Sequence, residues 1–245
     1  MTRSRGPLVR PERAVLLPGT GSDEVFVRSA FAGPLAALGI PLTAPPPPRG
    51  AAVTGGSLDL LDELAERAGR PLLVGGISLG AHLAAEWAVR SPHRCAGLLV
   101  ALPAWNGPAG GAPAAVAARA SADLVAREGV DRALRLATSG VAPWLAGELR
   151  RAWRRHGTGL AAALCAAAGH PAPTRAALRQ LAVPVGIAAC ADDPVHPAPV
   201  AHAWAAALPR AAVHETTLAA VGADRETLGR AALLAWLRAA RGVPR

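Results

Sequence analysis

The stretch LLVGGISLGAH, residues 72–82, places a serine between two glycines at the end of an apolar run. Its pattern is G-x-S-x-G, and the flanking residues predict a buried strand that ends at residue 77 and a helix that begins at residue 79. In that context a strained turn raises the serine hydroxyl above the sheet edge, and the glycines give the backbone room. Ser78 is therefore a candidate nucleophile. The alternative is a serine that caps the helix.

Short apolar runs closed by glycine or proline alternate with helical patterns through the first hundred residues. The runs predict strands buried on both faces, at 14–17, 41–44, 71–76 and 96–102. The helical patterns fall at about 24–38, 57–69 and 79–90. In the second of them, Ser57 is expected as the N-cap and Gly69 as the stop signal. Strands separated by helices of this length predict βαβ units and a parallel sheet.

The alternation stops in the middle of the chain. From Trp105 to about Leu181 the sequence contains alanine-rich helical stretches and no convincing strand. Strands are expected again at 183–190 and 211–218, with helices near 197–208 and 225–240. We therefore expect an α/β fold with a mostly parallel central sheet flanked by helices. It would form one domain over residues 1–245, with a helical lid insertion at approximately 105–181.

Composition and charge are those of a protein with one sizeable core that does not bind nucleic acid. The chain has 245 residues, of which 51% are hydrophobic, enough for one sizeable core. The formal net charge of +9 permits attraction to acidic partners. Nucleic acid is not expected as a partner, because aromatic residues make up only 3% and no binding motif is present.

Cysteine usage and hydropathy bear on the cellular compartment. Cys95, Cys165 and Cys190 have no metal-ligand spacing and do not suggest a disulfide framework, so we expect no metal and a cytoplasmic protein. The basic segment 1–13 lacks the apolar region of a secretory signal. No window of about 18 uncharged apolar residues predicts a membrane span.

These motifs resemble the α/β-hydrolase fold family over nearly the whole chain. The segment LLPGTGSDEVF, residues 16–26, looks like the family's oxyanion loop, with Pro18-Gly19 where a His-Gly pair is common. By that resemblance, the backbone amides of Thr20 and Leu79 would bind the oxyanion. The Leu79 amide also lies at the helix N-terminus, where amide groups point toward a developing negative charge.

The acid of a catalytic triad is implied by a second segment. CADDPVHP, residues 190–197, follows an apolar strand and resembles the family's G-x-x-D-x-x-x-P turn. The resemblance implies that Asp193 is the acid, with Cys190 in place of the usual glycine, while Asp192 points elsewhere. The alternative is a pair of aspartates that cap the next helix.

The base position departs from the family pattern. The family carries a histidine in a Gly-His pair after the last strand, but here Gly222 is followed by Ala223. A serine hydroxyl without a base is a poor nucleophile at neutral pH. His196, three residues beyond Asp193, is the expected substitute, at the sheet edge where the missing histidine would have been. A turn histidine at the rim of the pocket is the alternative.

Other residues are candidates for the pocket. His170 ends the insertion and would overhang the pocket, and His82 lies one helical turn beyond Ser78, where core packing is the alternative. Asp23 would bind part of the substrate or, alternatively, cap a helix. Trp105 would line an apolar acyl pocket or pack within the lid.

The resemblance also implies that the insertion covers the serine, as in lipases, esterases and thioesterases of this fold. Trp144 and Leu149 join Trp105 as expected lining residues. A basic cluster on the same insertion would attract an acidic or phosphorylated carrier of an acyl group, or would be a solvated helix face: Arg150, Arg151, Arg154 and Arg155.

Three functions are compatible with these residues. The first is a serine hydrolase that cleaves an ester or thioester through an acyl-enzyme on Ser78, acting without a cofactor on a small-molecule acyl substrate, either free or on an acyl carrier protein. The second, motivated by Ala223, is a non-hydrolytic binding or accessory protein of the same fold. The third is a cyclase or acyltransferase that uses the same pocket. We favour the first.

Overall fold

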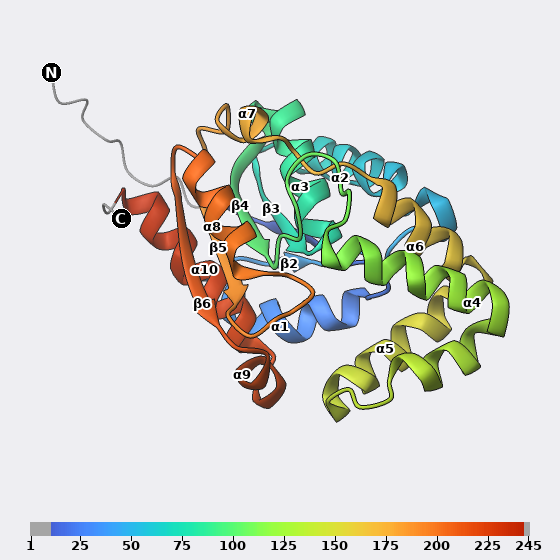
Figure 1. Ribbon diagram of the computed structural model, residues 1–245. Helices are drawn as coiled ribbons and strands as arrows, with labels where there is room; N and C mark the ends of the chain where they lie inside the picture. Colours follow the sequence, from blue (N-terminus) through green and yellow to red (C-terminus); the bar gives the residue numbers. More distant parts are fainter. Residues whose placement is uncertain (1–10, 243–245) are drawn as a thin grey trace, which may run out of the picture.

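The computed structural model describes residues 11–242 and contains a six-stranded, all-parallel sheet in the order β2-β1-β3-β4-β5-β6 (Figure 1). The sheet confirms the expected α/β architecture, and each predicted strand is present. Residues 1–10 of the basic N-terminal segment lie outside the described residues. The strands are β1 (Ala14–Leu17), β2 (Leu42–Thr43), β3 (Leu72–Ile77), β4 (Cys95–Ala101), β5 (Val185–Cys190) and β6 (Ala211–Thr216).

Helices cover both faces of this sheet (Figure 1). Residues of α1 (Glu24–Ala37) and α10 (Glu226–Arg241) form the core on one face. The other face is covered by α2 (Gly55–Ala68), α3 (Leu79–Arg90) and α8 (Ala198–Ala207). Two cores arise because alternate strand residues point to opposite faces.

The central strands are buried on both faces, as their continuous apolar runs predict, but β2 is not. Along β1, Val15 and Leu17 contribute to one core and Ala14 and Leu16 to the other. The prediction of full burial is wrong for β2, whose two residues are partly exposed, because β2 lies at the edge of the sheet.

The expected cap of α2 is also wrong. The helix begins at Gly55, after the short 3-10 helix η1 (Gly50–Val53), so Ser57 lies within its first turn. There the Ser57 hydroxyl donates to the carbonyl of Val53 at 2.6 Å. The expected stop is correct, because Gly69 adopts φ 63°, a left-handed conformation that glycine adopts without steric cost.

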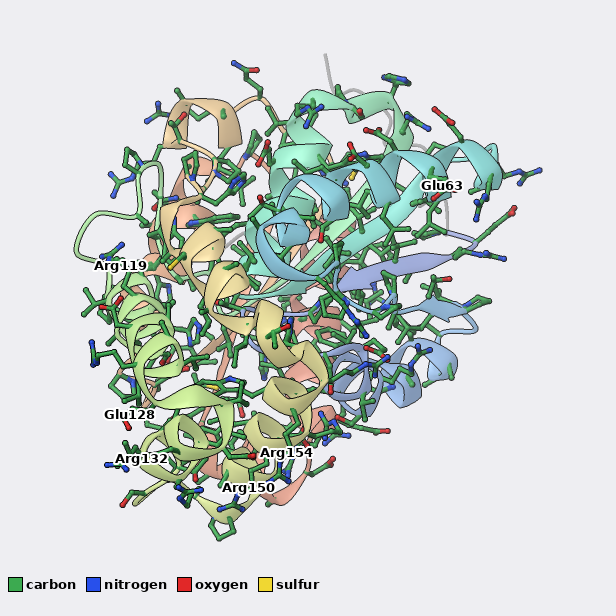
Figure 2. All side chains as sticks on the ribbon, turned by 90° about the vertical axis from the view of Figure 1, so that its right-hand side faces the viewer. Glu63, Arg119, Glu128, Arg132, Arg150 and Arg154 are labelled. Carbon is green, nitrogen blue, oxygen red and sulfur yellow. The ribbon has the colours of Figure 1, made fainter. Side chains whose placement is uncertain are left out.

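The segment between β4 and β5 contains the expected helices and packs beside the sheet (Figure 1). Its three longer helices have a small apolar core of their own, which includes Val125, Trp153 and Leu164. Figure 2 views the molecule from the side of this insertion. The helices are α4 (Pro113–Ala137), α5 (Pro143–His156), α6 (Leu160–Gly169) and the short α7 (Arg175–Leu178).

Three short helices complete the chain. They are η2 (Pro92–Arg94), η3 (Gly157–Gly159) and α9 (Leu218–Ala223). No helix within residues 11–242 is both long enough and apolar enough to cross a membrane. Over the same range, no cluster of three or more His, Cys, Asp or Glu side chains is arranged to hold a metal ion.

The contact between α1 and α10 requires a glycine. A Cβ atom added to Gly229 would lie 2.0 Å from the carbonyl oxygen of Ala30, so the two helix backbones approach as closely as they can. Gly147 in α5 has open space around the same position. The two helical glycines can therefore be compared directly, because Gly229 packs against a backbone and Gly147 has no atom near its Cβ position.

We predict that Gly229→Ala lowers the free energy of unfolding by about 1–3 kcal/mol, because the added methyl group forces α1 and α10 apart. Gly147→Ala should raise it by about 0.5–1 kcal/mol, because alanine restricts the unfolded chain and favours the helix. Chemical denaturation of both variants measures the difference. Equal effects at the two positions would contradict the packing argument.

Candidate active site

Ser78 lies in a strained turn between β3 and α3. Its backbone has φ 53° and ψ −114°, a region that residues with a Cβ atom rarely adopt. The flanking glycines are required by packing: a Cβ atom at Gly76 or Gly80 would lie 2.5 or 2.3 Å from the carbonyl oxygen of Leu17 in β1. The G-x-S-x-G pattern therefore results from the close contact between this turn and the neighbouring strand.

Ser78, His196 and Asp193 form a continuous chain of hydrogen bonds. The Oγ atom of Ser78 is 3.0 Å from Nε2 of His196, and Nδ1 of His196 is 2.9 Å from Oδ2 of Asp193. An ionised carboxylate only accepts, so the Nδ1–H of His196 donates to Asp193. In the neutral imidazole, Nε2 is then the acceptor for the Ser78 hydroxyl.

Asp193 and His196 are fixed by their own loop, between β5 and α8. The Oδ1 atom of Asp193 accepts hydrogen bonds from the amides of Val195 and His196, at 2.8 and 3.1 Å. Burial works to raise the pKa of Asp193, but the hydrogen bond and charge of His196 and the two amide donors outweigh it and hold the pKa below its ordinary value. Asp193 is therefore an ionised, oriented partner for the imidazole at neutral pH.

The expected family position of the base is occupied by an apolar wall. Gly222 and Ala223 lie in α9, and Gly222 packs against the indole of Trp144, which a Cβ atom would approach to 2.5 Å. Neighbouring Leu218 and Val221 line the cavity above Ser78. Asp192 points away from the triad, as expected, and accepts a hydrogen bond from the Leu218 amide at 2.6 Å.

The two expected oxyanion donors belong to segments that lie next to the serine. A Cβ atom at Gly19 would lie 3.4 Å from the Cβ of Ser78, which places the β1–α1 loop directly beside the turn. Thr20 lines the cavity, and its amide donates no hydrogen bond to another residue in the described range. Leu79 is the first residue of α3, where a helix leaves the N–H groups without an intrahelical acceptor.

A cavity of about 350 Å³ opens over Ser78 and is lined mainly by apolar side chains. Trp144 and Leu149 of α5 contribute to it, as the sequence suggests. Leu102, directly after β4, lines it with a strained φ of 54°. Cys190 lies in the wall, and burial, followed by the charges of Asp193 and Asp192, raises the pKa of its thiol to about 12. This cysteine is therefore a neutral packing group at physiological pH.

Three residues expected at the pocket do not line it. Trp105 and His82 pack in the core, where their rings meet edge to face at 4.6 Å. The Nε2 atom of His82 accepts a hydrogen bond from the Ala104 amide at 2.9 Å. His170 pairs with Glu86 of α3 at 2.7 Å instead of overhanging the cavity. For His82 the core-packing alternative is therefore correct, and Trp105 and His170 are held away from the cavity by an aromatic and a carboxylate partner.

Asp23 is also absent from the cavity wall, and the helix-capping alternative is correct. Its Oδ1 accepts from the amides of Val25 and Phe26, both at 3.1 Å, and both carboxylate oxygens bind Arg151 at 2.8 Å. Burial works to raise the pKa of Asp23, but the Arg151 hydrogen bond and charge and the amide donors hold it below its ordinary value. Asp23 therefore attaches the insertion to α1.

The basic cluster of α5 divides into two pairs. Arg151 and Arg155 bind Asp23 and Glu24 at the start of α1. Arg150 and Arg154 are exposed on the insertion (Figure 2). His156 at the end of this helix is buried, and its Nε2 lies 3.2 Å from the carbonyl of Ser22. One face of α5 is thus an attachment surface rather than a solvated one.

Sequence reasoning missed one charged residue of the cavity, Glu148 of α5. Glu148 lies three residues before Arg151, on the same helix face, and the two side chains form an ion pair. Its i, i+3 spacing from Arg151 is visible in the sequence, but the orientation of α5 toward the cavity is set by tertiary contacts.

Comparison with solved structures finds similar chains. A hydrolase from Pseudomonas aeruginosa PA01 is 22% identical, with 95% of this chain and 92% of that chain covered and a TM-score of 0.64. An esterase from Thermogutta terrifontis is 18% identical over 84% and 79%, with a TM-score of 0.60. The enol-lactonase from Burkholderia xenovorans LB400 is 18% identical over 82% and 80%, also with a TM-score of 0.60.

Sequence comparisons found nothing comparable: no protein-family model matches the chain, and no curated protein does. The likeness at 16–22% identity therefore establishes a shared fold and does not by itself carry over an activity.

We predict that His82 makes the protein acid-sensitive. Burial, followed by the charges of His196 and His170, lowers the pKa of His82 to about 3. Since the unfolded chain takes up this proton near pH 6.5, acid favours unfolding. Below about pH 6 the residue should cost roughly 1.4 kcal/mol of stability per pH unit, until the pH approaches the folded pKa.

Urea denaturation of the wild type and His82→Gln across this pH range tests the effect. The variant should show a flatter pH dependence, whatever its stability at neutral pH. His93→Gln, at an exposed histidine with no hydrogen bond or ion pair among the described residues, is the control and should keep the wild-type slope. Parallel curves for the wild type and His82→Gln would contradict the prediction.

Proposed function

We propose that this chain, which has the α/β-hydrolase fold, is a serine hydrolase that cleaves a carboxylic ester or thioester through an acyl-enzyme on Ser78. The observation that carries the proposal is the chain of hydrogen bonds from Ser78 through His196 to Asp193, at 3.0 and 2.9 Å. A nucleophile within reach of a base, itself oriented by a carboxylate, is the arrangement that activates a serine hydroxyl.

In the first half of the reaction, Nε2 of His196 takes the Ser78 proton as Oγ attacks the substrate carbonyl carbon. The carbonyl oxygen becomes negatively charged and is stabilised by the amides of Thr20 and Leu79. The tetrahedral intermediate collapses, the bond to the leaving alcohol or thiol breaks, and His196 returns the proton to that group. The acyl chain remains on Ser78 as an ester.

In the second half, His196 removes a proton from water, and the hydroxide attacks the acyl-enzyme. Collapse of the second intermediate releases the carboxylic acid, and the proton returns to Ser78 Oγ. Asp193 remains ionised throughout. It holds the Nδ1–H tautomer of His196 and stabilises the imidazolium that forms in each half.

The cavity favours a small, largely apolar substrate. Its volume of about 350 Å³ is at the low end of the range for small-molecule sites. The esterase and the enol-lactonase among the similar structures act on the same type of bond. Because two of the four clustered arginines already pair with Asp23 and Glu24, we place a free small-molecule ester ahead of a carrier-bound acyl group.

The non-hydrolytic alternative was motivated by Ala223, at the position where the family has its base. His196, from the loop after β5, places an imidazole nitrogen 3.0 Å from Ser78 Oγ. The alanine at position 223 is therefore no longer a reason to favour a non-hydrolytic protein. The distance favours the hydrolase over a binding protein.

We predict that a fluorophosphonate probe labels the wild type and that Ser78→Ala abolishes labelling and hydrolysis of short p-nitrophenyl esters. The probe reacts only with an activated serine, which this site supplies. Ser139→Ala, at an exposed serine of the insertion, is the matched control and should label normally. A wild type that resists labelling beside a reactive control esterase would refute the mechanism.

We further predict that Asp193→Asn lowers kcat by about 10³–10⁴, with a much smaller change in KM, because an asparagine amide stabilises the wrong tautomer of His196. Asp192→Asn changes the adjacent carboxylate, which contacts only the Leu218 amide among the hydrogen bonds of the described residues, and should retain most of the activity. Steady-state kinetics on the same ester distinguishes the two. Equal losses would argue against Asp193 as the orienting acid.

A further inference from the structure

One carboxylate faces an otherwise apolar part of the cavity wall. Glu148 of α5 lines the cavity together with its helix neighbours Trp144, Leu145 and Leu149. The triad already accounts for Asp193 and His196, so Glu148 is a charged lining residue with no part in the proposed chemistry. An apolar substrate would remove water from this carboxylate without replacing its hydrogen bonds, which is costly.

The Glu148 carboxylate is held at one oxygen and open at the other. Its Oε2 pairs with Arg151. Its Oε1 lies 3.9 Å from Nε of Arg225, which is too far for a direct hydrogen bond. The Nε–H of Arg225 is buried and has no acceptor among the described residues. An unused acceptor and an unused donor therefore lie side by side.

Arg225 cannot readily turn to close this gap. Its Nη1 donates to the carbonyls of Val221 and Gly222, at 2.9 and 2.5 Å. Its guanidinium group also stacks on Trp144, with the central carbon 4.5 Å from the ring centroid. These contacts fix the guanidinium while Nε remains without an acceptor.

The charges around this gap are balanced. Glu148 and Asp23 carry two negative charges, and Arg151 and Arg225 carry two positive charges, joined by the contacts Arg151–Asp23, Arg151–Glu148 and Arg225–Glu148. A charged ligand group would upset this balance. A neutral group that donates a hydrogen bond would satisfy Glu148 Oε1 without adding charge.

We propose that Glu148 is a specificity-determining residue that selects esters carrying a hydroxyl group, which donates to Glu148 Oε1. The inference rests on the proposed hydrolase function and adds the substrate class. A carboxylate at the same point is repelled by Glu148, and an alkyl group leaves the Glu148 acceptor unsatisfied. Sites that hydrogen-bond a substrate group discriminate strongly against analogues that lack it.

The test is a set of matched esters hydrolysed by the full chain. Methyl esters of straight-chain ω-hydroxy acids are compared with alkanoic esters and with monoesters of dicarboxylic acids, over a range of chain lengths. A second series places the hydroxyl group on the alcohol portion of the ester. We expect the wild type to favour the hydroxylated ester by about tenfold or more in kcat/KM at the best length, and to reject the carboxylate.

Glu148→Met should remove most of this preference and most of the rejection of the carboxylate ester, because a side chain of similar length then offers neither a charge nor a strong hydrogen-bonding group. Hydrolysis of the plain alkanoic ester should change far less. The control is Glu128→Met, at a glutamate of the same insertion that pairs with Arg132, both labelled in Figure 2. It should keep the wild-type ratios.

The outcomes separate the two proposals. No hydrolysis of any ester, with no labelling of Ser78, contradicts the proposed function itself. Active enzyme that shows no hydroxyl preference in either series overturns the role of Glu148, and this result needs no variant. A preference that survives in Glu148→Met overturns it as well.

Discussion

The close contact between the Ser78 turn and β1 is the constraint on which the site depends. The carbonyl oxygen of Leu17 leaves no room for a Cβ atom at Gly76 or Gly80. With that contact made, the turn must adopt the positive φ that lifts the serine hydroxyl above the sheet. The same contact brings the β1–α1 loop beside the serine, so one packing requirement positions Ser78 and Thr20 together.

The remaining members of the triad share a single loop. Asp193 and His196 are three residues apart, and the aspartate fixes that loop by accepting two of its amides while it orients the imidazole. In the family pattern the acid and base come from two separate loops. With both after β5, α9 supplies apolar wall residues, and an imidazole lies within hydrogen-bonding distance of Ser78 although Ala223 follows Gly222.

The sequence predicts best what depends on local rules. Alternating apolar runs and Gly or Pro signals define the strands, and the elbow, Asp193 and His196 lie directly after strand ends, where the carboxyl edge of a parallel sheet gathers them. Long-range packing decides the rest. Trp105, His82 and His170 follow strands or helices near the site too, but aromatic and carboxylate partners from distant segments draw them away from the cavity.

The charged residues of α5 show why the residues that line the cavity could not be predicted from the sequence. A run of arginines on a helix usually indicates a solvated face, yet Arg151 reaches a buried aspartate that already caps α1. That ion pair is one of the contacts that hold α5 against the start of α1, beside Arg155–Glu24 and His156–Ser22. Because Glu148 is one turn away on the same face, fixing Arg151 also turns Glu148 toward the cavity. Asp23 thus takes part both in the attachment of the insertion, together with Glu24 and Ser22, and in the placement of Glu148 in the cavity wall.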